Sequence, residues 1–245
     1  MRVKLVVAYD GTNYCGWQIQ PNGITIQEVL NKTLSELFRT PITTIGASRT
    51  DSGVHSLGNV CVFDVNTRMP AEKISYALNQ RLPEDIVVLD STEVPDDFHP
   101  RFSKSRKTYE YRILNRSFRD PTRRLDTHFF HYPLDVAKMN EAAKFLIGEH
   151  DFASFCAANA QSETTIRTIY DASVVRDDDI IRIRVTGNGF LYNMVRIIAG
   201  TLIKIGDGDM PASAMKQIIE AADRSAAGPT APANGLTMIG LEYET

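Results

Sequence analysis

The sequence predicts an α+β protein of two similar lobes, each a mainly antiparallel β-sheet with helices on one face, with an active-site cleft between them. Three observations lead to this expectation. The 245 residues suffice for one large domain or two small ones. Both halves mix segments of strand periodicity with about two helical segments, and Pro100 interrupts the chain between them. We therefore expect an N-terminal lobe at 1–103, carrying a loop with a candidate catalytic aspartate, and a C-terminal lobe at 104–245.

The elements of the expected N-terminal lobe follow from local periodicity and turn signals. Thr25 and Glu28 have the spacing of a capping box, so a helix is expected to begin beside them and to end before Pro41. The other expected elements are strands at 2–9, 59–65 and 86–89 and a helix at 70–80.

The expected C-terminal lobe repeats this mixture. Tyr109 and Tyr111 fall on one face of a strand expected at 107–114, because side chains alternate along a strand. A hairpin is expected to turn at 176–178. The other expected elements are a helix at 135–147, hairpin strands at 166–175 and 179–185, helices at 190–205 and from 211 to about 224, a loop at 226–234 and a strand at 236–243.

Composition is typical of a soluble globular protein, with 43% hydrophobic and 23% charged residues. No apolar run approaches the roughly 18 residues of a membrane span, and the N-terminus lacks the pattern of a signal peptide. Cys15, Cys61 and Cys156 lie far apart, which disfavours a disulfide framework and a zinc site. We expect a cytoplasmic protein without a membrane or metal partner.

Positive charge is concentrated in one segment, although the net charge is −3. Between Arg101 and Asp126 there are nine Lys or Arg residues and three acidic residues. Screening confines their field to about 8–10 Å, so this segment could neutralise phosphates on an otherwise acidic protein. A solvated charged face explains the same pattern equally well.

Arg49 and Asp51 lie two residues apart in the stretch ASRTDSGVH, so an extended chain would place both side chains on one side. Gly53 permits a tight turn close to a ligand. A lone carboxylate can act as a nucleophile or general base, whereas a two-carboxylate or metal mechanism is disfavoured because no second acid is near in sequence. Taken by itself, the motif is more often a turn aspartate that caps its own backbone.

Two further stretches contain candidate residues. KSRKTYEY at 104–111 interleaves lysine and arginine with tyrosine, a pattern suited to RNA, although a half-buried tyrosine on an edge strand is the simpler interpretation. Arg196 lies in an otherwise apolar helix and needs an acidic partner there, for which Asp51 is a candidate. His128 and His131 point to opposite faces of a strand-like run, so a metal site there is disfavoured.

Seven stretches occur in a fixed order and span almost the whole chain: YDGTNYCGWQ at 9–18, ASRTDSGVHSLGNV at 47–60, FHPRFS at 98–103, KTYEYRI at 107–113, DFASF at 151–155, GNGFLYNMVRIIAGTL at 187–202 and GLTMIGLEY at 235–243. Together they resemble the tRNA pseudouridine synthase A family, for which the RTD loop and the FLYNMVR helix are quite specific. Small departures occur at Ser48, Ser52 and Asn59, where Gly, Ala and Gln are frequent. They touch neither Arg49 nor Asp51, and we expect them to alter loop packing only.

The resemblance implies an enzyme that isomerises uridines 38, 39 and 40 in the anticodon stem-loop of tRNA to pseudouridine, without a cofactor, as a homodimer. It implies that Asp51 is the catalytic nucleophile, that Tyr109 packs on the target base and that Arg196 pairs with Asp51. Arg49 would help to displace the target nucleotide. The remaining residues expected to bind the substrate are His55, Arg101, Lys104, Arg106 and Lys107.

The target base must be flipped out of the RNA, at a cost of a few kcal/mol. Whether Asp51 attacks C6 of the base, attacks C1′ of the sugar or abstracts a sugar proton stays open. Two other functions also stay open on the residues alone: an RNA-binding protein without turnover, and a hydrolase that uses Asp51 with a metal.

Overall fold

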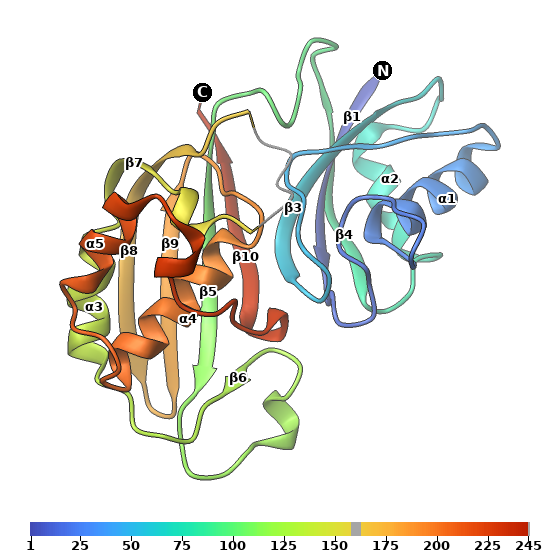
Figure 1. The fold of residues 1–245 in the computed structure, drawn as a ribbon. Helices are drawn as coiled ribbons and strands as arrows, with labels where there is room; N and C mark the ends of the chain where they lie inside the picture. The colour runs from blue at the N-terminus through green and yellow to red at the C-terminus, as the bar shows by residue number, and fades with distance from the viewer. Residues whose placement is uncertain (158–162, 245) are drawn as a thin grey trace. The chain divides into compact units, whose positions relative to one another are not determined.

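The computed structural model describes residues 1–157 and 163–244, which form two compact units (Figure 1). One unit comprises Met1–Ser105 together with the chain from Met238 onward, and the other comprises Arg106–Thr237. The division near residue 105 lies close to the expected boundary, but the C-terminal strand joins the first unit instead of the second. The Tyr243 hydroxyl donates to Pro100 O at 2.9 Å, and its ring packs edge-on against Phe98. This long-range packing leaves no local signal in the sequence.

The first unit is a sheet with strand order β4-β1-β3-β10, in which β1 is antiparallel to both β3 and β4. The two helices of this unit lie on one face of the sheet (Figure 1). Its elements are β1 (Arg2–Tyr9), α1 (Ile26–Phe38), β2 (Ile45–Gly46), β3 (His55–Asp64), α2 (Ala71–Asn79), β4 (Ile86–Val94) and most of β10 (Leu236–Tyr243).

The core of the first unit forms as the periodicity predicts. Val3, Leu5 and Val7 alternate with less buried residues along β1 and face the helices. The N-cap of α1 is Thr25, whose side chain accepts a hydrogen bond from the Glu28 amide, as expected for a capping residue.

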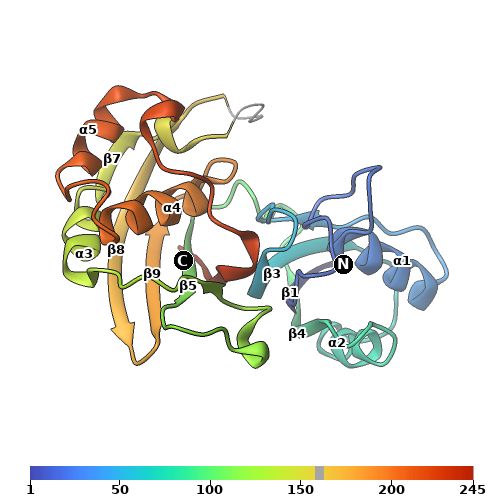
Figure 2. The ribbon, with the colours of Figure 1, turned by 60° about the horizontal axis from the view of Figure 1, so that its bottom comes forward.

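The second unit is an antiparallel sheet with strand order β5-β9-β8-β7, and helices α3, α4 and α5 cover one face of it (Figures 1 and 2). A short strand, β6, pairs parallel with β5. The elements are β5 (Ser105–Leu114), η1 (Pro121–Arg123), β6 (His128–Phe129), α3 (Val136–Lys144), β7 (Gly148–Asp151), η2 (Ala153–Phe155), β8 (Ile166–Asp177), β9 (Ile180–Gly187), α4 (Met194–Gly206), α5 (Ala214–Ala221), η3 (Arg224–Ala226) and η4 (Ala233–Gly235).

Several boundaries in the second unit differ from expectation by a few residues, and two of them have a cause in the backbone conformation. The helix expected from residue 190 begins only at Met194, because Asn193 has a φ of 60° and cannot continue a right-handed helix. The hairpin turns at Asp178 and Asp179 instead of 176–178, and Asp178 takes the positive φ of 55° that a tight two-residue turn needs.

Helix α4 is buried along its whole length except at Arg196 and Lys204. The segment 226–234, expected as a loop, lies directly against this helix. A Cβ on Gly200 would stand 1.8 Å from Pro229 O, so only glycine allows this approach. The backbone amide of Ala231 donates to Arg196 O at 3.0 Å.

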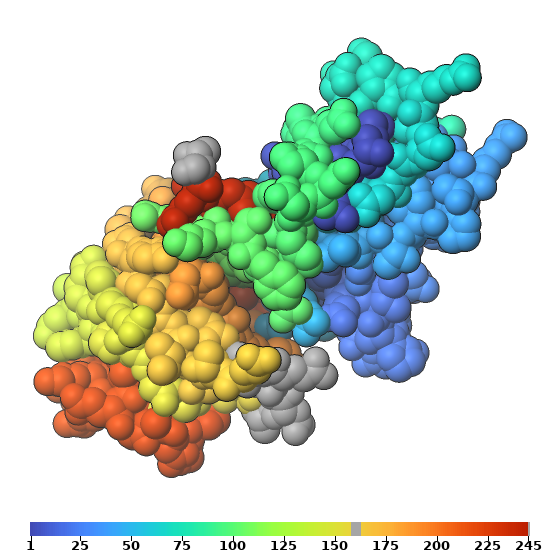
Figure 3. All heavy atoms as spheres, turned by 90° about the horizontal axis from the view of Figure 1, so that it is seen from above, coloured from blue at the N-terminus to red at the C-terminus, as the bar shows by residue number. Residues whose placement is uncertain are grey.

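No helix among the described residues is long and apolar enough to cross a membrane. The segment that leads into β5 lies on the surface (green in Figure 3), and Arg101, Phe102 and Lys104 in it are exposed.

Candidate active site

The loop of residues 47–54, here called the Asp51 loop, is held by the chain segment 10–17 of the same unit. The Trp17 amide donates to Thr50 O at 3.1 Å, and the Gly53 amide donates to Tyr14 O at 3.2 Å. Gly16 has a φ of +83°, and a Cβ there would stand 2.5 Å from Thr50 O. The two segments therefore fit together only with glycine at this position.

A buried set of hydrogen bonds lies beneath the Asp51 loop. The hydroxyls of Tyr9 and Thr50 are 2.8 Å apart. The Asn59 amide group donates to Ser48 O at 3.0 Å and to the Tyr9 hydroxyl at 3.3 Å. Thr50 is thus directed into the unit, whereas Asp51 on its C-terminal side is half-buried. Asn59, a departure from the family pattern, is a direct support of the loop.

Arg49 is an exposed residue of this loop. Partial desolvation lowers the pKa of Arg49 from its ordinary value, and the positive charge of Arg101 lowers it further. Arginine remains charged at neutral pH. The two cations therefore share one region of the first unit, where an anion would relieve their repulsion.

His55 is buried at the start of β3. Its Nδ1 accepts a hydrogen bond from the Gly11 amide at 3.1 Å and lies 3.0 Å from Asp10 Oδ1. Its Nε2 has no hydrogen-bond partner among the described residues. Burial opposes ionisation of Asp10, but hydrogen bonds from Thr12 and the nearby His55 bring the pKa of Asp10 below its ordinary value. His55 thus joins the 10–12 turn to the end of the Asp51 loop, and its contact with substrate stays a prediction.

Tyr109 lies on the helix-covered face of β5 in the second unit and is buried. Its ring packs edge-on against Phe190, with the ring centroids 5.0 Å apart. Phe190 lies just before α4 in the chain. Tyr109 therefore packs against the segment that leads into the helix carrying Arg196.

The Arg196 guanidinium is fixed within the second unit by two hydrogen bonds. Its Nε donates to Ala231 O and its Nη1 donates to Asn193 Oδ1, each at 2.8 Å. The left-handed conformation of Asn193 thus both delays the start of α4 and supplies a partner for the arginine. Asp51 belongs to the other unit, so its contact with Arg196 stays a prediction.

The basic segment 101–126 is less uniformly cationic than its composition indicates. Arg112 bonds to Glu110 and Asp126, and Arg116 bonds to Asp179. Arg106 lies over the Tyr170 ring at 4.7 Å, and Lys107 is half-buried. Part of the expected positive charge is therefore neutralised within the protein.

Glu110 is the centre of an ion network on β5 and β9, and only 1% of it is exposed. It receives hydrogen bonds from Arg112, Arg182 and Arg184 at 2.7, 3.3 and 2.6 Å. Burial raises the pKa of Glu110, but the bonds from Arg112 and Arg184 outweigh it and leave the pKa below its ordinary value. This network was not expected from the sequence, in which Glu110 reads as one polar residue of an alternating strand.

Among the described residues, no group of three or more His, Cys, Asp or Glu side chains is arranged to hold a metal ion. His128 and His131 belong to an aromatic run, in which the His128 ring lies near Tyr111 and Phe130.

Comparison with known proteins identifies relatives over the full chain. A family model described as tRNA pseudouridine synthase matches residues 5–103 and 142–244. The protein named tRNA pseudouridine synthase A of Thermoanaerobacter sp. (strain X514) is 49% identical over 241 residues, covering 98% of this chain and 99% of the relative. Its namesakes of Clostridium acetobutylicum and Geotalea uraniireducens are 47% and 43% identical, and each match covers at least 98% of both chains.

Proposed function

Since the chain belongs to the tRNA pseudouridine synthase family and is an isomerase acting on tRNA, we propose that it converts uridines 38, 39 and 40 of the anticodon stem-loop to pseudouridine, with Asp51 as the nucleophile. The observation that carries this proposal is the construction of the Asp51 loop. Buried bonds through Tyr9, Thr50 and Asn59 fix the chain before Asp51, and the bond from the Gly53 amide to Tyr14 O fixes the chain after it. Such positioning is what a single catalytic carboxylate requires.

The reaction is an isomerisation, so it needs no net oxidant, reductant or external nucleophile. The N1–C1′ glycosidic bond breaks, the uracil rotates, a C5–C1′ bond forms, and the proton on C5 is lost while N1 gains one. Asp51 would form and then release a bond to the base or sugar, or would take and return a sugar proton.

Arg196 would pair with Asp51 and favour its ionised form against the desolvation that a bound RNA imposes. Its guanidinium is already oriented by Asn193 and Ala231. Tyr109 would pack against the target base, since its ring is held in place by Phe190.

Flipping the uridine costs a few kcal/mol, which contacts with the RNA backbone can offset. We assign this role to Arg49 for the displaced nucleotide and to Arg101, Lys104, Arg106 and Lys107 for the backbone. Arg49 and Arg101 already repel each other, which favours an anion near both.

We also propose that the enzyme acts as a homodimer in which one tRNA contacts both subunits, as the resemblance implies, and that it acts in the cytoplasm. The free thiols of Cys15, Cys61 and Cys156 support a reducing compartment.

The test is the Asp51→Asn variant, assayed for pseudouridine at each position of unmodified tRNA. We expect turnover to fall at least about 10³-fold, because removing a nucleophile removes the reaction path. Asp90→Asn, the same change at an exposed position of the first unit, is expected to leave turnover unchanged. Near wild-type turnover of Asp51→Asn would refute the nucleophile assignment. Salt-sensitive tRNA binding without product in the wild type would favour a binding protein, and activity lost on chelation would favour a metal hydrolase.

A further inference from the structure

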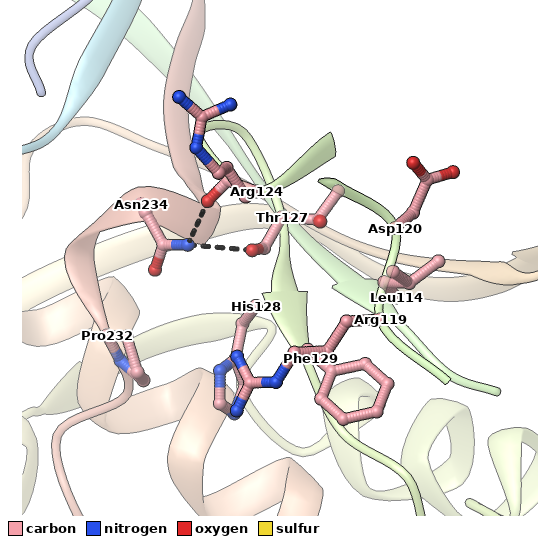
Figure 4. Close-up of a pocket in the computed structure, with 9 residues that line it drawn as sticks. All are labelled: Leu114, Arg119, Asp120, Arg124, Thr127, His128, Phe129, Pro232 and Asn234. Carbon is pink, nitrogen blue, oxygen red and sulfur yellow. Dashed lines mark hydrogen bonds between the residues drawn. The ribbon is translucent and has the colours of Figure 1, made fainter. Parts of the chain in front are cut away.

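The second unit contains a pocket of about 310 Å³ at the start of β6 (Figure 4). We call it the Arg119 pocket. It is lined by Leu114, Arg119, Asp120, Arg124, Thr127, His128, Phe129, Pro232 and Asn234. Its volume is at the lower end of the range for ligand sites, which suits one small ligand unit. Seven of these nine residues fall between the two segments that the family model matches.

Arg119 presents unused hydrogen-bond donors. Its guanidinium lies 4.9 Å from the centre of the Phe129 ring. Within the described part of the chain, it forms no side-chain hydrogen bond or ion pair. An exposed arginine that stacks on a ring and has unused donors is preorganised for a phosphate, because little side-chain freedom remains to be lost on binding.

His128 lies beside Arg119 (Figure 4) and offers both a donor and an acceptor. Its ring nitrogens form no hydrogen bond with the described residues, although the side chain is half-buried. Burial lowers the pKa of His128 from its ordinary value, and the charge of Arg119 lowers it further. The ring is therefore neutral near pH 7, with one N–H group and one lone pair.

The remaining wall combines an amide with apolar surface. Asn234 Nδ2 donates to Thr127 O at 2.7 Å and to Arg124 O at 3.1 Å, as Figure 4 shows. This leaves its Oδ1 as an acceptor, and Pro232 and Leu114 provide apolar surface.

The one acidic residue of the pocket is already engaged. Asp120 accepts hydrogen bonds from the Thr122 amide and hydroxyl at 2.9 and 2.7 Å. It also lies within 4.0 Å of Arg116 and Arg123. These partners offset its charge, so an anion at Arg119 meets no uncompensated carboxylate.

The surface around the pocket has the character of an RNA-binding surface. Phe118 is 80% exposed and lies in sequence between Arg116 and Arg119. Arg123 and Arg124 are exposed nearby. Exposed rings among arginines are the combination that stacks on bases and contacts phosphates in single-stranded RNA.

We propose that the Arg119 pocket binds one nucleotide of the tRNA other than the uridine that is isomerised, with its phosphate at Arg119 and its base against His128, Asn234 and Pro232. This inference rests on the proposed function. It adds a second point of attachment to the RNA, located wholly in the second unit. A free mononucleotide has the same chemistry, but the surrounding cationic and aromatic surface favours a nucleotide within a longer RNA.

The first test measures the affinity of the full chain for unmodified tRNA as a function of salt, in the Asp51→Asn background so that no turnover occurs. We expect Arg119→Ala to weaken binding about tenfold and to reduce the salt slope by about one, as the loss of one phosphate contact does. Arg119→Lys should recover only part of the affinity, because lysine keeps the charge without the planar fork. Unchanged affinity in Arg119→Ala would overturn the proposal.

Two controls separate the pocket from general charge. Arg81→Ala removes an exposed arginine of the first unit, whose guanidinium bonds only its own helix end at Ala77 O among the described contacts, and should change affinity less than about twofold. Arg123→Ala removes a cation beside the pocket that does not line it. If Arg123→Ala lost as much tRNA affinity as Arg119→Ala, the RNA would bind a diffuse cationic surface and the pocket would be refuted. Melting temperatures check that each variant is folded.

A second experiment distinguishes the two sources of the nucleotide. Uridine monophosphate is titrated into the wild-type chain and into Arg119→Ala. We expect weak, millimolar binding that depends on Arg119 and a tRNA affinity that also depends on it. Tight binding of the mononucleotide with an unchanged tRNA affinity in the variant would instead identify a site for the free nucleotide.

Steady-state kinetics separates failure of this inference from failure of the proposed function. Arg119→Ala in the otherwise wild-type chain should raise KM about tenfold and leave kcat unchanged, because the contact is made equally in the ground and transition states. Pseudouridine formed with unaltered KM would leave the function intact and refute the pocket. Weakened tRNA binding in Arg119→Ala, together with no pseudouridine from the wild type, would support the pocket and refute the proposed function.

Discussion

The Asp51 loop and the Arg119 pocket both bring polar side chains to the surface of a unit, and they are supported in opposite ways. Beneath the loop, Tyr9, Thr50 and Asn59 are buried and bonded to one another. In the pocket, Arg119 and His128 retain donors that the described chain does not use. A group that must react needs a fixed position, whereas a group that binds needs an open partner. The comparison predicts that damage near the loop lowers kcat, and damage at the pocket raises KM.

Among residues that support the loop or the pocket, the largest effect is expected from Gly16→Ala. The added Cβ would meet Thr50 O, and the positive φ would be strained. A displacement of the loop by about 1 Å should lower kcat about 100-fold. The control is Gly208→Ala, which has a φ of +94° and nothing within 4 Å. Melting curves should show a loss of stability in both variants, because both glycines have a positive φ. Pseudouridine assays should show a loss of kcat only in Gly16→Ala. An equal loss of kcat in both would break the comparison.

Asn59→Ala should lower kcat about tenfold with little change in KM, because Ser48 O and the Tyr9 hydroxyl lose a donor. The matched control is Asn79→Ala, which removes two hydrogen bonds to Val88 elsewhere in the unit. Both variants should lose about 1–3 kcal/mol of unfolding free energy. If Asn79→Ala lowered kcat as much, the effect of Asn59 would be one of stability alone.

Glu110→Gln tests a closed network within the unit that holds the open pocket. The substitution should reduce the free energy of unfolding at pH 7 by about 2–3 kcal/mol, because three arginines lose a charged partner. The pKa of Glu110 is lowered in the folded state. Its contribution is therefore complete above about pH 4.3, the ordinary value, and is lost as the pH falls through the folded-state pKa.

Denaturant unfolding of wild type and Glu110→Gln between pH 7 and pH 3 checks this prediction. The difference in stability should shrink toward acid pH, while tRNA affinity at pH 7 stays within about twofold. A difference in stability that is independent of pH would exclude the carboxylate charge as its cause.

The smallest effect is expected from Phe129→Leu, which removes the ring below Arg119. Loss of a partly exposed cation–π contact costs about 0.5–1 kcal/mol, so tRNA affinity should fall about twofold to fivefold. Tyr76→Leu removes the ring below Lys73 in the first unit and should leave the affinity unchanged. Equal effects in a filter-binding assay would show that the ring at Phe129 does not preorganise the site.

Local patterns predicted those elements whose residues interact with near neighbours. Strands β1 and β10 have the expected bounds. Burial alternates over the whole of β1, whereas in β10 the first three residues are all buried. Helix α4 begins later than expected because Asn193 has a left-handed conformation. That conformation depends on contacts of Asn193 in the folded protein, such as the hydrogen bond from Arg196, and local periodicity does not reveal them. The family resemblance is what implies roles for Asp51, Tyr109 and Arg196, which the single motifs left open and which stay predictions.

The supports of the candidate site could not be read locally. Tyr9 and Thr50 are 41 residues apart, and Asn234 reaches Thr127 across 107 residues. Such pairs form only in the folded sheet, so no spacing in the sequence predicts them. The same holds for Glu110, whose partners Arg182 and Arg184 lie on the neighbouring strand.

The segment 226–234 has one further consequence, which concerns its length. Ala231 accepts a hydrogen bond from Arg196 and donates one to the same residue, while Asn234 holds Arg124 and Thr127 only three positions later. One inserted or deleted residue between them would detach one end or the other. From its alanine and proline content, this stretch looks like a linker that would tolerate changes in length. Its length is nevertheless fixed, because Ala231 and Asn234 are both bonded to other parts of the unit.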